Sequence, residues 1–270
     1  MALATGLGLE RLDAQLLLLH ALGRPQHDRA WLLAHDDDAL TPALAQSFAA
    51  LVQRRAEGEP LAYLTGSKAF YGMELQVSPA VLIPRPDTET LVDWALELLP
   101  PGRPARLLDL GTGSGAIALA LGQQRPDARI HALDFSAAAL QVAQANAQAL
   151  GLQLQWHQGC WLQGLNERGF DVIVSNPPYI AEGDSHLEAL RHEPLSALVS
   201  GADGLDDIRT ILASAPGHLA PQGWLLFEHG YDQAEKLRAM LAGHGFQAVQ
   251  SRRDLAGVER CTGGQWPGCA

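Results

Sequence analysis

The chain has 270 residues, of which 47% are hydrophobic and 18% are charged, a composition typical of a folded protein and not of a disordered one. No apolar run approaches the roughly 18 residues that a membrane-spanning helix needs, so we expect no membrane association. The net charge is −11, whereas a protein that holds duplex nucleic acid through its phosphates is expected to have a basic surface. The charge therefore favours a small molecule or a protein as the partner.

The cysteines also limit the possible classes of site. Cys160, Cys261 and Cys269 have neither the spacing of a zinc site nor that of a disulfide framework. We therefore expect no metal site. A reducing, cytoplasmic location is the natural one for a chain with these cysteines.

The first part of the chain has a helical pattern. Leu9, Leu12 and Leu16 recur at helical spacing, and Thr41-Pro42 is typical of an N-cap followed by proline at the first helical position. This pattern predicts a small helical domain over residues 1–60. Residues 61–86 then predict a β-hairpin linker with its turn near Gly72.

From residue 87 to residue 270 strands and helices alternate. Near-continuous apolar strands alternating with helices indicate an α/β domain with a mostly parallel sheet covered on both faces. The pattern predicts helices over residues 88–99, 116–124, 137–150, 205–219 and 233–243, and strands over 106–110, 129–133, 152–157, 170–175 and 224–228, followed by a last pair of strands.

A glycine-rich loop follows the first strand of this domain. It contains Gly111, Thr112, Gly113, Ser114 and Gly115 and leads directly into a helix, whose free amide groups favour anionic oxygens. An acid at the end of the next strand, Asp134, has the spacing of a ribose-binding carboxylate. A nucleoside cofactor is therefore expected, but this loop alone does not distinguish a nicotinamide cofactor from S-adenosylmethionine.

A second motif, Asn176-Pro177-Pro178-Tyr179, follows the apolar strand 170–175. The two prolines stiffen the backbone and remove two amide donors, so the carbonyl of Asn176 or Pro177 and the Asn176 side-chain oxygen are available as acceptors for a planar –NH2 group. Tyr179 offers a face on which a flat group can stack. Asn176, Pro177 and Tyr179 are the predicted catalytic positions. All four residues are predicted to bind the substrate, and Asn176 is also a predicted cofactor-binding position.

This arrangement suits the methylation of an amide or aromatic amine nitrogen. The lone pair of such a nitrogen is delocalised, and two acceptors on its hydrogens can orient it toward an electrophilic methyl group. The sulfonium of S-adenosylmethionine makes that methyl group reactive, so orientation would carry the catalysis. The sequence shows no general base for the proton that leaves afterwards.

With these motifs, the sequence resembles the PrmC/HemK family, whose members methylate the glutamine of the Gly-Gly-Gln tripeptide in bacterial peptide chain release factors. The resemblance covers nearly the whole chain. It includes Phe70-Tyr71-Gly72, the stretch from Ile83 to Glu89, both motifs above, and the long segment from Glu193 to Gly230. It implies a class I S-adenosylmethionine-dependent methyltransferase with a Rossmann-like, mostly parallel seven-stranded sheet, preceded by a helical substrate-recognition domain.

The resemblance also implies roles for individual residues. The Gly111–Gly115 loop would hold the methionine end of the cofactor, Asp134 its ribose and Trp161 its adenine, while Asn176–Tyr179 would receive the glutamine amide. The product would be S-adenosylhomocysteine. The partner would be a release factor, bound by a monomeric enzyme without direct contact to nucleic acid. Arg85 and Glu89 are expected to line the entrance or to tie the linker to the catalytic domain.

The two motifs are also compatible with other functions. Amino-methyltransferases that act on adenine or cytosine have similar Asn-Pro-Pro-Tyr loops, and a sister family methylates a ribosomal protein glutamine. A nicotinamide dehydrogenase is disfavoured because no catalytic Ser-Tyr-Lys or histidine pairing is recognisable, and a non-catalytic binding protein would bind the cofactor without transferring methyl. The tail contains Gly263-Gly264-Gln265, but we expect the glycines to form a turn and do not expect self-methylation.

Overall fold

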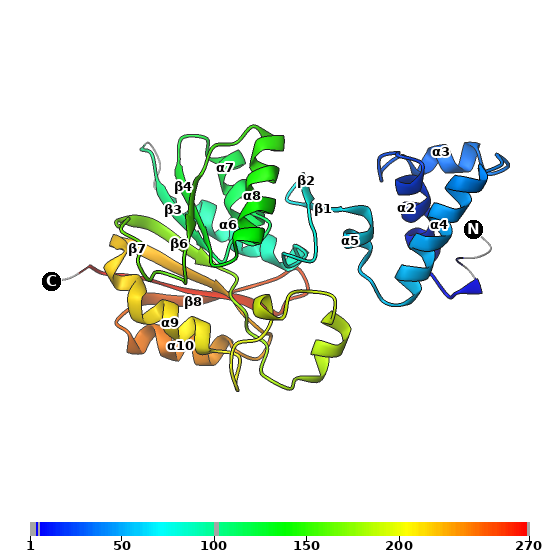
Figure 1. The fold of residues 1–270 in the computed structure, drawn as a ribbon. Helices are drawn as coiled ribbons and strands as arrows, with labels where there is room; N and C mark the ends of the chain where they lie inside the picture. Colours follow the sequence, from blue (N-terminus) through cyan, green and yellow to red (C-terminus); the bar gives the residue numbers. More distant parts are fainter. Residues whose placement is uncertain (1–3, 5, 100–102, 269–270) are drawn as a thin grey trace. The chain divides into compact units, whose positions relative to one another are not determined.

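The computed structural model describes residues 4, 6–99 and 103–268 and divides into two compact units, Met1–Ser67 and Lys68–Ala270. Each unit has its own hydrophobic core. Cys269 lies outside the described residues. The first unit contains helices α2 (Arg11–Ala21), α3 (Arg29–Ala34), α4 (Pro42–Ala56) and α5 (Leu61–Thr65) among its described residues (Figure 1).

The core of the first unit forms where α2, α4 and α5 meet. Leu17, Phe48 and Val52 are buried there, and Leu64 of α5 joins them. Helix α4 begins as the sequence predicts, because the Thr41 hydroxyl accepts a hydrogen bond from the Leu44 amide at 3.4 Å. The unit extends beyond residue 60, to Ser67, since burying Leu64 requires α5 to pack onto the preceding helices.

A two-stranded hairpin follows, formed by β1 (Ser67–Phe70) and β2 (Met73–Gln76). The turn lies at Tyr71 and Gly72, as the sequence predicts, with φ angles of 48° and 75°. Positive φ at both central residues is the conformation of the two-residue turns that match the twist of paired strands.

The second unit is built on a seven-stranded sheet in the order β5-β4-β3-β6-β7-β9-β8. Strand β9 runs antiparallel to both of its neighbours, whereas the pairs from β5 to β7 are parallel. The strands are β3 (Arg106–Leu110), β4 (Arg129–Asp134), β5 (Gln155–Gln158), β6 (Phe170–Ser175), β7 (Leu219–Glu228), β8 (Gln247–Arg253) and β9 (Glu259–Gln265).

Two of these strands differ from the sequence-based bounds by more than one residue. Strand β5 begins only at Gln155, because Leu152 and Leu154 pack against the core from the preceding loop. Strand β7 begins earlier than predicted, at Leu219, and includes Pro221 and Gln222, whose φ is 63°. Proline and a positive φ are unusual inside a strand, so the local sequence did not indicate this part of β7.

Helices cover both faces of the sheet (Figure 1). Side chains alternate along each strand, so Leu107 packs into one core and Leu108 into the other. One face carries α6 (Glu89–Leu98), α7 (Ala116–Gln124) and α8 (Ala137–Leu150), and the other carries α9 (Asp206–Ser214) and α10 (Ala234–Gly243). No helix among the described residues is long and apolar enough to span a membrane.

The tail motif Gly263-Gly264-Gln265 lies inside β9, so the expectation that these glycines form a turn was wrong. A Cβ at Gly263 would lie 2.4 Å from Leu226 Cδ2, and glycine is therefore needed for close packing of the sheet. Gln265 pairs with Trp224, whereas Glu228 at the carboxyl end of β7 pairs with Cys261. Gln265 thus lies away from the carboxyl ends of the parallel strands, which gives no support to self-methylation.

Candidate active site

The glycine-rich loop connects β3 to α7 at the carboxyl edge of the sheet. Gly111 and Gly115 have φ angles of 72° and 84°, in the left-handed region that L side chains rarely adopt. A Cβ at Gly111 would lie 3.2 Å from the Trp161 ring, and one at Gly115 would lie 3.2 Å from Ala143 Cβ on α8. Both glycines therefore allow close packing around the loop, which the sequence predicted as a cofactor site.

Asp134 ends β4 beside this loop. Its Oδ2 accepts a hydrogen bond from the Gly113 amide, and its Oδ1 accepts one from the Ser136 amide, each at 2.9 Å. Burial raises the pKa of Asp134, and the backbone hydrogen bonds from Ser136 and Gly113 act to lower it. A carboxylate has about four acceptor positions, so Asp134 keeps capacity to bind hydroxyl groups in the cavity that it lines.

Asp109, on β3, stabilises the glycine-rich loop through hydrogen bonds. Its Oδ2 accepts hydrogen bonds from the Thr112 hydroxyl at 2.7 Å and from the Ala118 amide at 3.2 Å, so it joins the loop to α7. Burial is the main cause that raises the pKa of Asp109 to about 7. Its Oδ1 is buried without a hydrogen bond partner among the described residues.

Two aromatic residues form part of the cavity wall. Trp161 donates a hydrogen bond from its indole Nε1 to Oδ1 of Asp207 at 2.9 Å, which fixes the plane of the ring. Phe135 follows Asp134 directly and is 56% exposed, although it is a large hydrophobic residue. The sequence motifs did not indicate Phe135 or Asp207 as site residues. The position of Phe135 next to the predicted ribose-binding acid was a usable signal, whereas nothing in the sequence marked Asp207.

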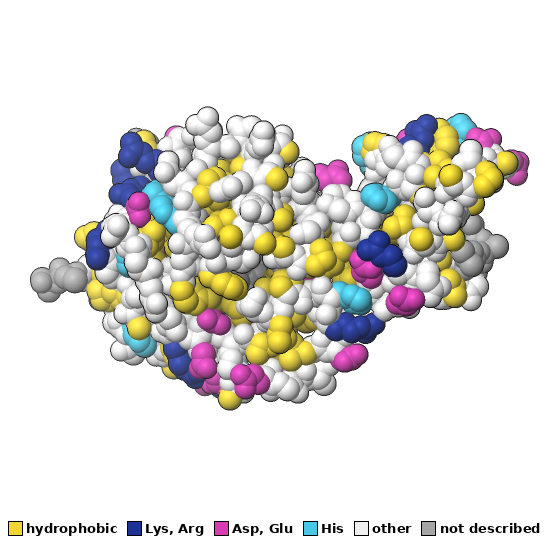
Figure 2. All heavy atoms as spheres, viewed as in Figure 1, with side chains coloured by type: hydrophobic (Ala, Val, Ile, Leu, Met, Phe, Trp, Pro, Cys, Tyr) yellow, Lys and Arg dark blue, Asp and Glu magenta, His cyan; other side chains and the backbone are white. Residues whose placement is uncertain are grey.

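These elements enclose a cavity of about 550 Å³, within the range of about 300–1,000 Å³ that is typical of small-molecule sites. Hydrophobic side chains gather around a hollow on the visible face of this unit (Figure 2). The predicted site residues that line the cavity are Gly111, Thr112, Ser114, Asp134, Trp161, Asn176 and Pro178. The structure does not bring the other predicted residues to its wall, and these are Gly113, Gly115, Pro177 and Tyr179.

Asn176 stands at the cavity wall directly after β6. The preceding Ser175 hydroxyl donates to the Leu110 carbonyl at 2.8 Å, which ties the end of β6 to the end of β3. The Asn176 amide Nδ2 donates to the Thr88 hydroxyl oxygen at 3.4 Å. Its Oδ1 is buried and has no hydrogen bond partner among the described residues. An unpaired buried amide oxygen is costly, so it indicates an acceptor that is kept for a ligand.

Tyr179 does not offer its ring to the cavity, in contrast to the sequence-based expectation. Its backbone is held instead, because its amide donates to the Leu198 carbonyl at 3.2 Å and its carbonyl accepts from Gln233 Nε2 at 3.0 Å. The phenol is largely buried. Burial is the main cause that raises the pKa of Tyr179 to about 12, and the nearby Glu228 carboxylate also raises it. The phenol therefore stays protonated. The backbone hydrogen bonds of Tyr179 hold the loop in place.

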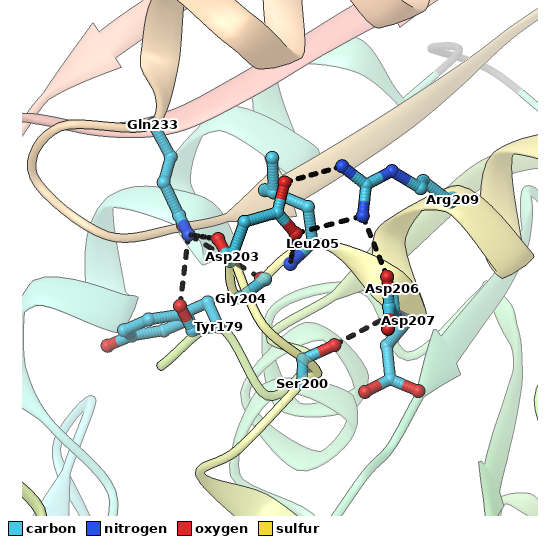
Figure 3. A network of polar contacts seen from close by, with 9 residues as sticks. All are labelled: Tyr179, Ser200, Asp203, Gly204, Leu205, Asp206, Asp207, Arg209 and Gln233. Carbon is cyan, nitrogen blue, oxygen red and sulfur yellow. Dashed lines mark hydrogen bonds and ion pairs between the residues drawn. The ribbon is translucent and has the colours of Figure 1, made fainter. Parts of the chain in front are cut away.

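Figure 3 shows how Gln233 joins two loops. Its side-chain amide lies against the carbonyl oxygens of Tyr179, Asp203 and Gly204, at 3.0, 3.5 and 3.5 Å. A Cβ at Gly204 would lie 2.2 Å from the Tyr179 carbonyl oxygen, so only glycine permits this approach. Arg209 closes the network through its ion pair with Asp203 at 2.6 Å.

Arg85 and Glu89 were expected either to line the entrance or to tie the linker to the catalytic domain. In the structure the two residues have different roles. Arg85 lines the cavity and forms an ion pair with the buried carboxylate of Glu193, which also accepts from the Ile83 amide at 3.1 Å. Glu89 accepts a hydrogen bond from the amide of Tyr71 at 2.9 Å and thereby holds the hairpin turn against α6.

The architecture defines a class I methyltransferase: a mostly parallel sheet with a reversed strand, a glycine loop after the first strand of the Rossmann-like domain, and an acid at the end of the next strand. A methyltransferase structure from Pyrococcus furiosus shares this fold, with a TM-score of 0.57 and 18% identity over 80% of this chain and 98% of that one. Residues 90–203 match the family Methyltransferase small domain, and residues 3–66 match the PrmC N-terminal domain.

Sequence comparison with named proteins assigns the chain to one family of methyltransferases. The release factor glutamine methyltransferase of Xylella fastidiosa is 51% identical over 263 residues, which cover 96% of this chain and 94% of that protein. The release factor glutamine methyltransferase of Bordetella pertussis is 50% identical and covers 95% of each chain. The chain therefore belongs to the release factor glutamine methyltransferase family, as the sequence motifs predicted.

Proposed function

We propose that this chain transfers the methyl group of S-adenosylmethionine to the side-chain amide nitrogen of the glutamine in the Gly-Gly-Gln motif of peptide chain release factors. The observation that carries the proposal is the unpaired side-chain oxygen of Asn176 beside a cofactor-sized cavity next to the glycine loop. The names of relatives that are about half identical to this chain support the same substrate.

The residues around the cavity suit S-adenosylmethionine and, after reaction, S-adenosylhomocysteine. Asp134 would accept hydrogen bonds from the ribose hydroxyls, Phe135 and Trp161 would provide flat apolar surfaces for the adenine, and Thr112 with Ser114 would lie along the methionine end. Gly113 and Gly115 would act through the backbone shape of the loop. When bound, the cofactor supplies an electrophilic methyl group on a sulfonium.

Asn176 and the prolines after it would receive the target amide. Asn176 Oδ1 would accept one N–H of the glutamine side chain, and the Pro177 backbone carbonyl would accept the other. Both prolines are buried and lack amide hydrogens, so the loop holds its acceptors without competing donors. Tyr179, through its backbone hydrogen bonds, would keep this loop rigid. Orientation of the nitrogen is then the main contribution of the protein.

The first unit is proposed to recognise the release factor. Exposed leucines lie on it, with Leu33 at 65% exposure, Leu12 at 44% and Leu40 at 37%, and exposed apolar surface often marks an interaction site. The acidic net charge of the chain argues against recognition of nucleic acid through its phosphates. We expect the enzyme to act as a monomer in the cytoplasm.

The test mixes purified enzyme and methyl-labelled S-adenosylmethionine with one of three substrates: a release factor, the same factor with its Gly-Gly-Gln glutamine changed to asparagine, or duplex DNA. We expect label in the first substrate and background in the others. Asparagine is the matched control because it keeps the amide but shortens the side chain by one methylene. Label in DNA alone would assign the chain to the nucleic-acid methyltransferases and contradict the proposal.

A further inference from the structure

A buried glutamate lies behind the predicted catalytic loop. Glu228 ends β7 and is 2% exposed, and its Oε2 has no partner with hydrogen bond geometry among the described residues. Strands β6 and β7 are adjacent and parallel, with Ser175 opposite Phe227, so the next residues, Asn176 and Glu228, lie side by side at the carboxyl edge of the sheet. A carboxylate is costly to bury unless it interacts with polar groups, and here those groups belong to the active site.

Two neighbours of Glu228, Thr88 and Asn176, line the cavity and carry hydrogen bond donors. The Thr88 hydroxyl and the Asn176 amide lie close enough to act as donors that lower the pKa of Glu228. The Thr88 oxygen also accepts from Asn176 Nδ2 at 3.4 Å. The –NH2 arm of Asn176 is therefore on the side of Thr88 and Glu228. The oxygen of a planar amide lies on its other arm, and in Asn176 this oxygen is the one without a partner.

We infer that Glu228 is a positioning residue for methyl transfer: its carboxylate, which only accepts hydrogen bonds, holds the –NH2 arm of Asn176 and leaves the amide oxygen for the substrate. The inference rests on the proposed function. An asparagine amide has two orientations of similar shape, and a purely accepting neighbour selects one of them. A protonated Glu228 would gain an O–H donor and would no longer select the productive orientation.

The charges around Glu228 define the pH dependence. Burial is the main cause that raises the pKa of Glu228 to about 7; Asp87 also raises it, whereas Arg260 lowers it. The nearby Tyr179 phenol and Cys261 thiol both have raised pKa values and stay protonated over the same range. The active orientation needs the ionised carboxylate, so kcat is expected to rise with pH as Glu228 ionises.

The main test is Glu228→Gln, which keeps the size of the side chain but adds a donor. We expect kcat on the release factor to fall about tenfold or more, while KM for both substrates changes less than about threefold. The rise of kcat with pH should disappear. Glu228→Asp, which keeps the carboxylate, should recover part of kcat. Glu97→Gln is the control, because Glu97 is an exposed carboxylate on α6 that pairs with Arg252.

A kcat and pH profile for Glu228→Gln within about twofold of wild type would contradict the inference. If Glu228→Gln does not fold, the pH profile of the wild-type enzyme decides, and a kcat that does not rise with pH as Glu228 ionises would be equally contrary. A wild-type enzyme that does not methylate the release factor would contradict the proposed function itself, so the two failures are distinguishable.

Discussion

The indole nitrogen of Trp161 donates a hydrogen bond to the carboxylate of Asp207, with 2.9 Å between Nε1 and Oδ1. The Asp207 amide donates to the Ser200 hydroxyl at 2.8 Å (Figure 3), and the Ser200 amide donates to the carbonyl of Ile180 at 3.0 Å. Ile180 directly follows the Asn176–Tyr179 loop. The aromatic wall of the cavity is thus connected to the loop that is proposed to receive the substrate.

Removal of the Asp207 carboxylate should weaken cofactor binding. In Asp207→Ala the indole loses its acceptor, and we expect the affinity for S-adenosylmethionine to fall about fivefold, as for one lost hydrogen bond of about 1 kcal/mol. Asp207→Asn keeps an acceptor oxygen and should remain within about twofold of wild type. Isothermal titration calorimetry would measure both affinities. Equal losses in the two variants would show that the hydrogen bond to Trp161 does not matter.

Asp134→Asn should weaken the same affinity more strongly. The carboxylate already accepts from Gly113 and Ser136, and an asparagine has only one acceptor oxygen for these amides and for the ribose. We expect a loss of about 10- to 100-fold, as for a hydrogen bond to a charged group. The control is Asp127→Asn, since Asp127 is half-exposed and pairs with Arg125. Unchanged binding by Asp134→Asn would remove this residue from the cofactor site.

Asn176→Ala should affect turnover and not folding. The variant loses the acceptor proposed for the glutamine amide, so we expect kcat to fall at least about 100-fold. The thermal midpoint should stay near that of wild type, because the lost side-chain bond to Thr88 is long, at 3.4 Å. Asn166→Ala, at an exposed loop asparagine, is the matched control. Near-normal turnover by Asn176→Ala would rule out the mechanism.

Two glycines test the packing of the substrate loop. Gly204 and Gly183 have similar φ angles, 74° and 78°, but a Cβ at Gly204 would meet the Tyr179 carbonyl oxygen whereas one at Gly183 would meet nothing within 4 Å. Gly183→Ala should cost about 1–2 kcal/mol of unfolding free energy from backbone strain alone. Gly204→Ala should cost about 3 kcal/mol or more and also lower kcat. Urea unfolding would compare them, and equal costs would contradict the close approach.

The buried carboxyl of Asp109 predicts a pH-dependent stability. Its pKa is raised to about 7 in the folded chain, against about 3.9 in an unfolded chain. The folded state therefore binds this proton more tightly, and the stability from it is fully present below about pH 4 and is lost as the pH rises toward 7.

Asp109→Asn cannot ionise and should avoid this loss. We expect the stability of the variant relative to wild type to rise between about pH 4 and about pH 7, as measured by urea unfolding. Glu228 is present in both proteins, so the difference isolates Asp109. A difference that stays constant with pH would mean that Asp109 is ionised throughout this range.

The amino-acid sequence by itself predicted the alternating elements and the two motifs of the site. Strands β3 and β6 are largely apolar, with Leu107, Leu108 and Leu110 in the first and Val172 to Val174 in the second, so neighbouring residues suffice to indicate them. Both motifs follow directly on strands, and the carboxyl ends of parallel strands meet at one edge of the sheet. Asp134 and Asn176 could therefore be assigned to one site before their contacts were known.

Only the tertiary structure decided which residues surround these motifs. Glu228, Asp207 and Gln233 lie far along the chain from the loops that they contact, and strand order, which local patterns do not encode, brings them there. Tyr179 was expected at the cavity because its motif suggested stacking, but its backbone contacts to Leu198 and Gln233 hold it elsewhere. Local sequence determines where a strand ends, whereas the environment of its last side chain depends on which strands become its neighbours.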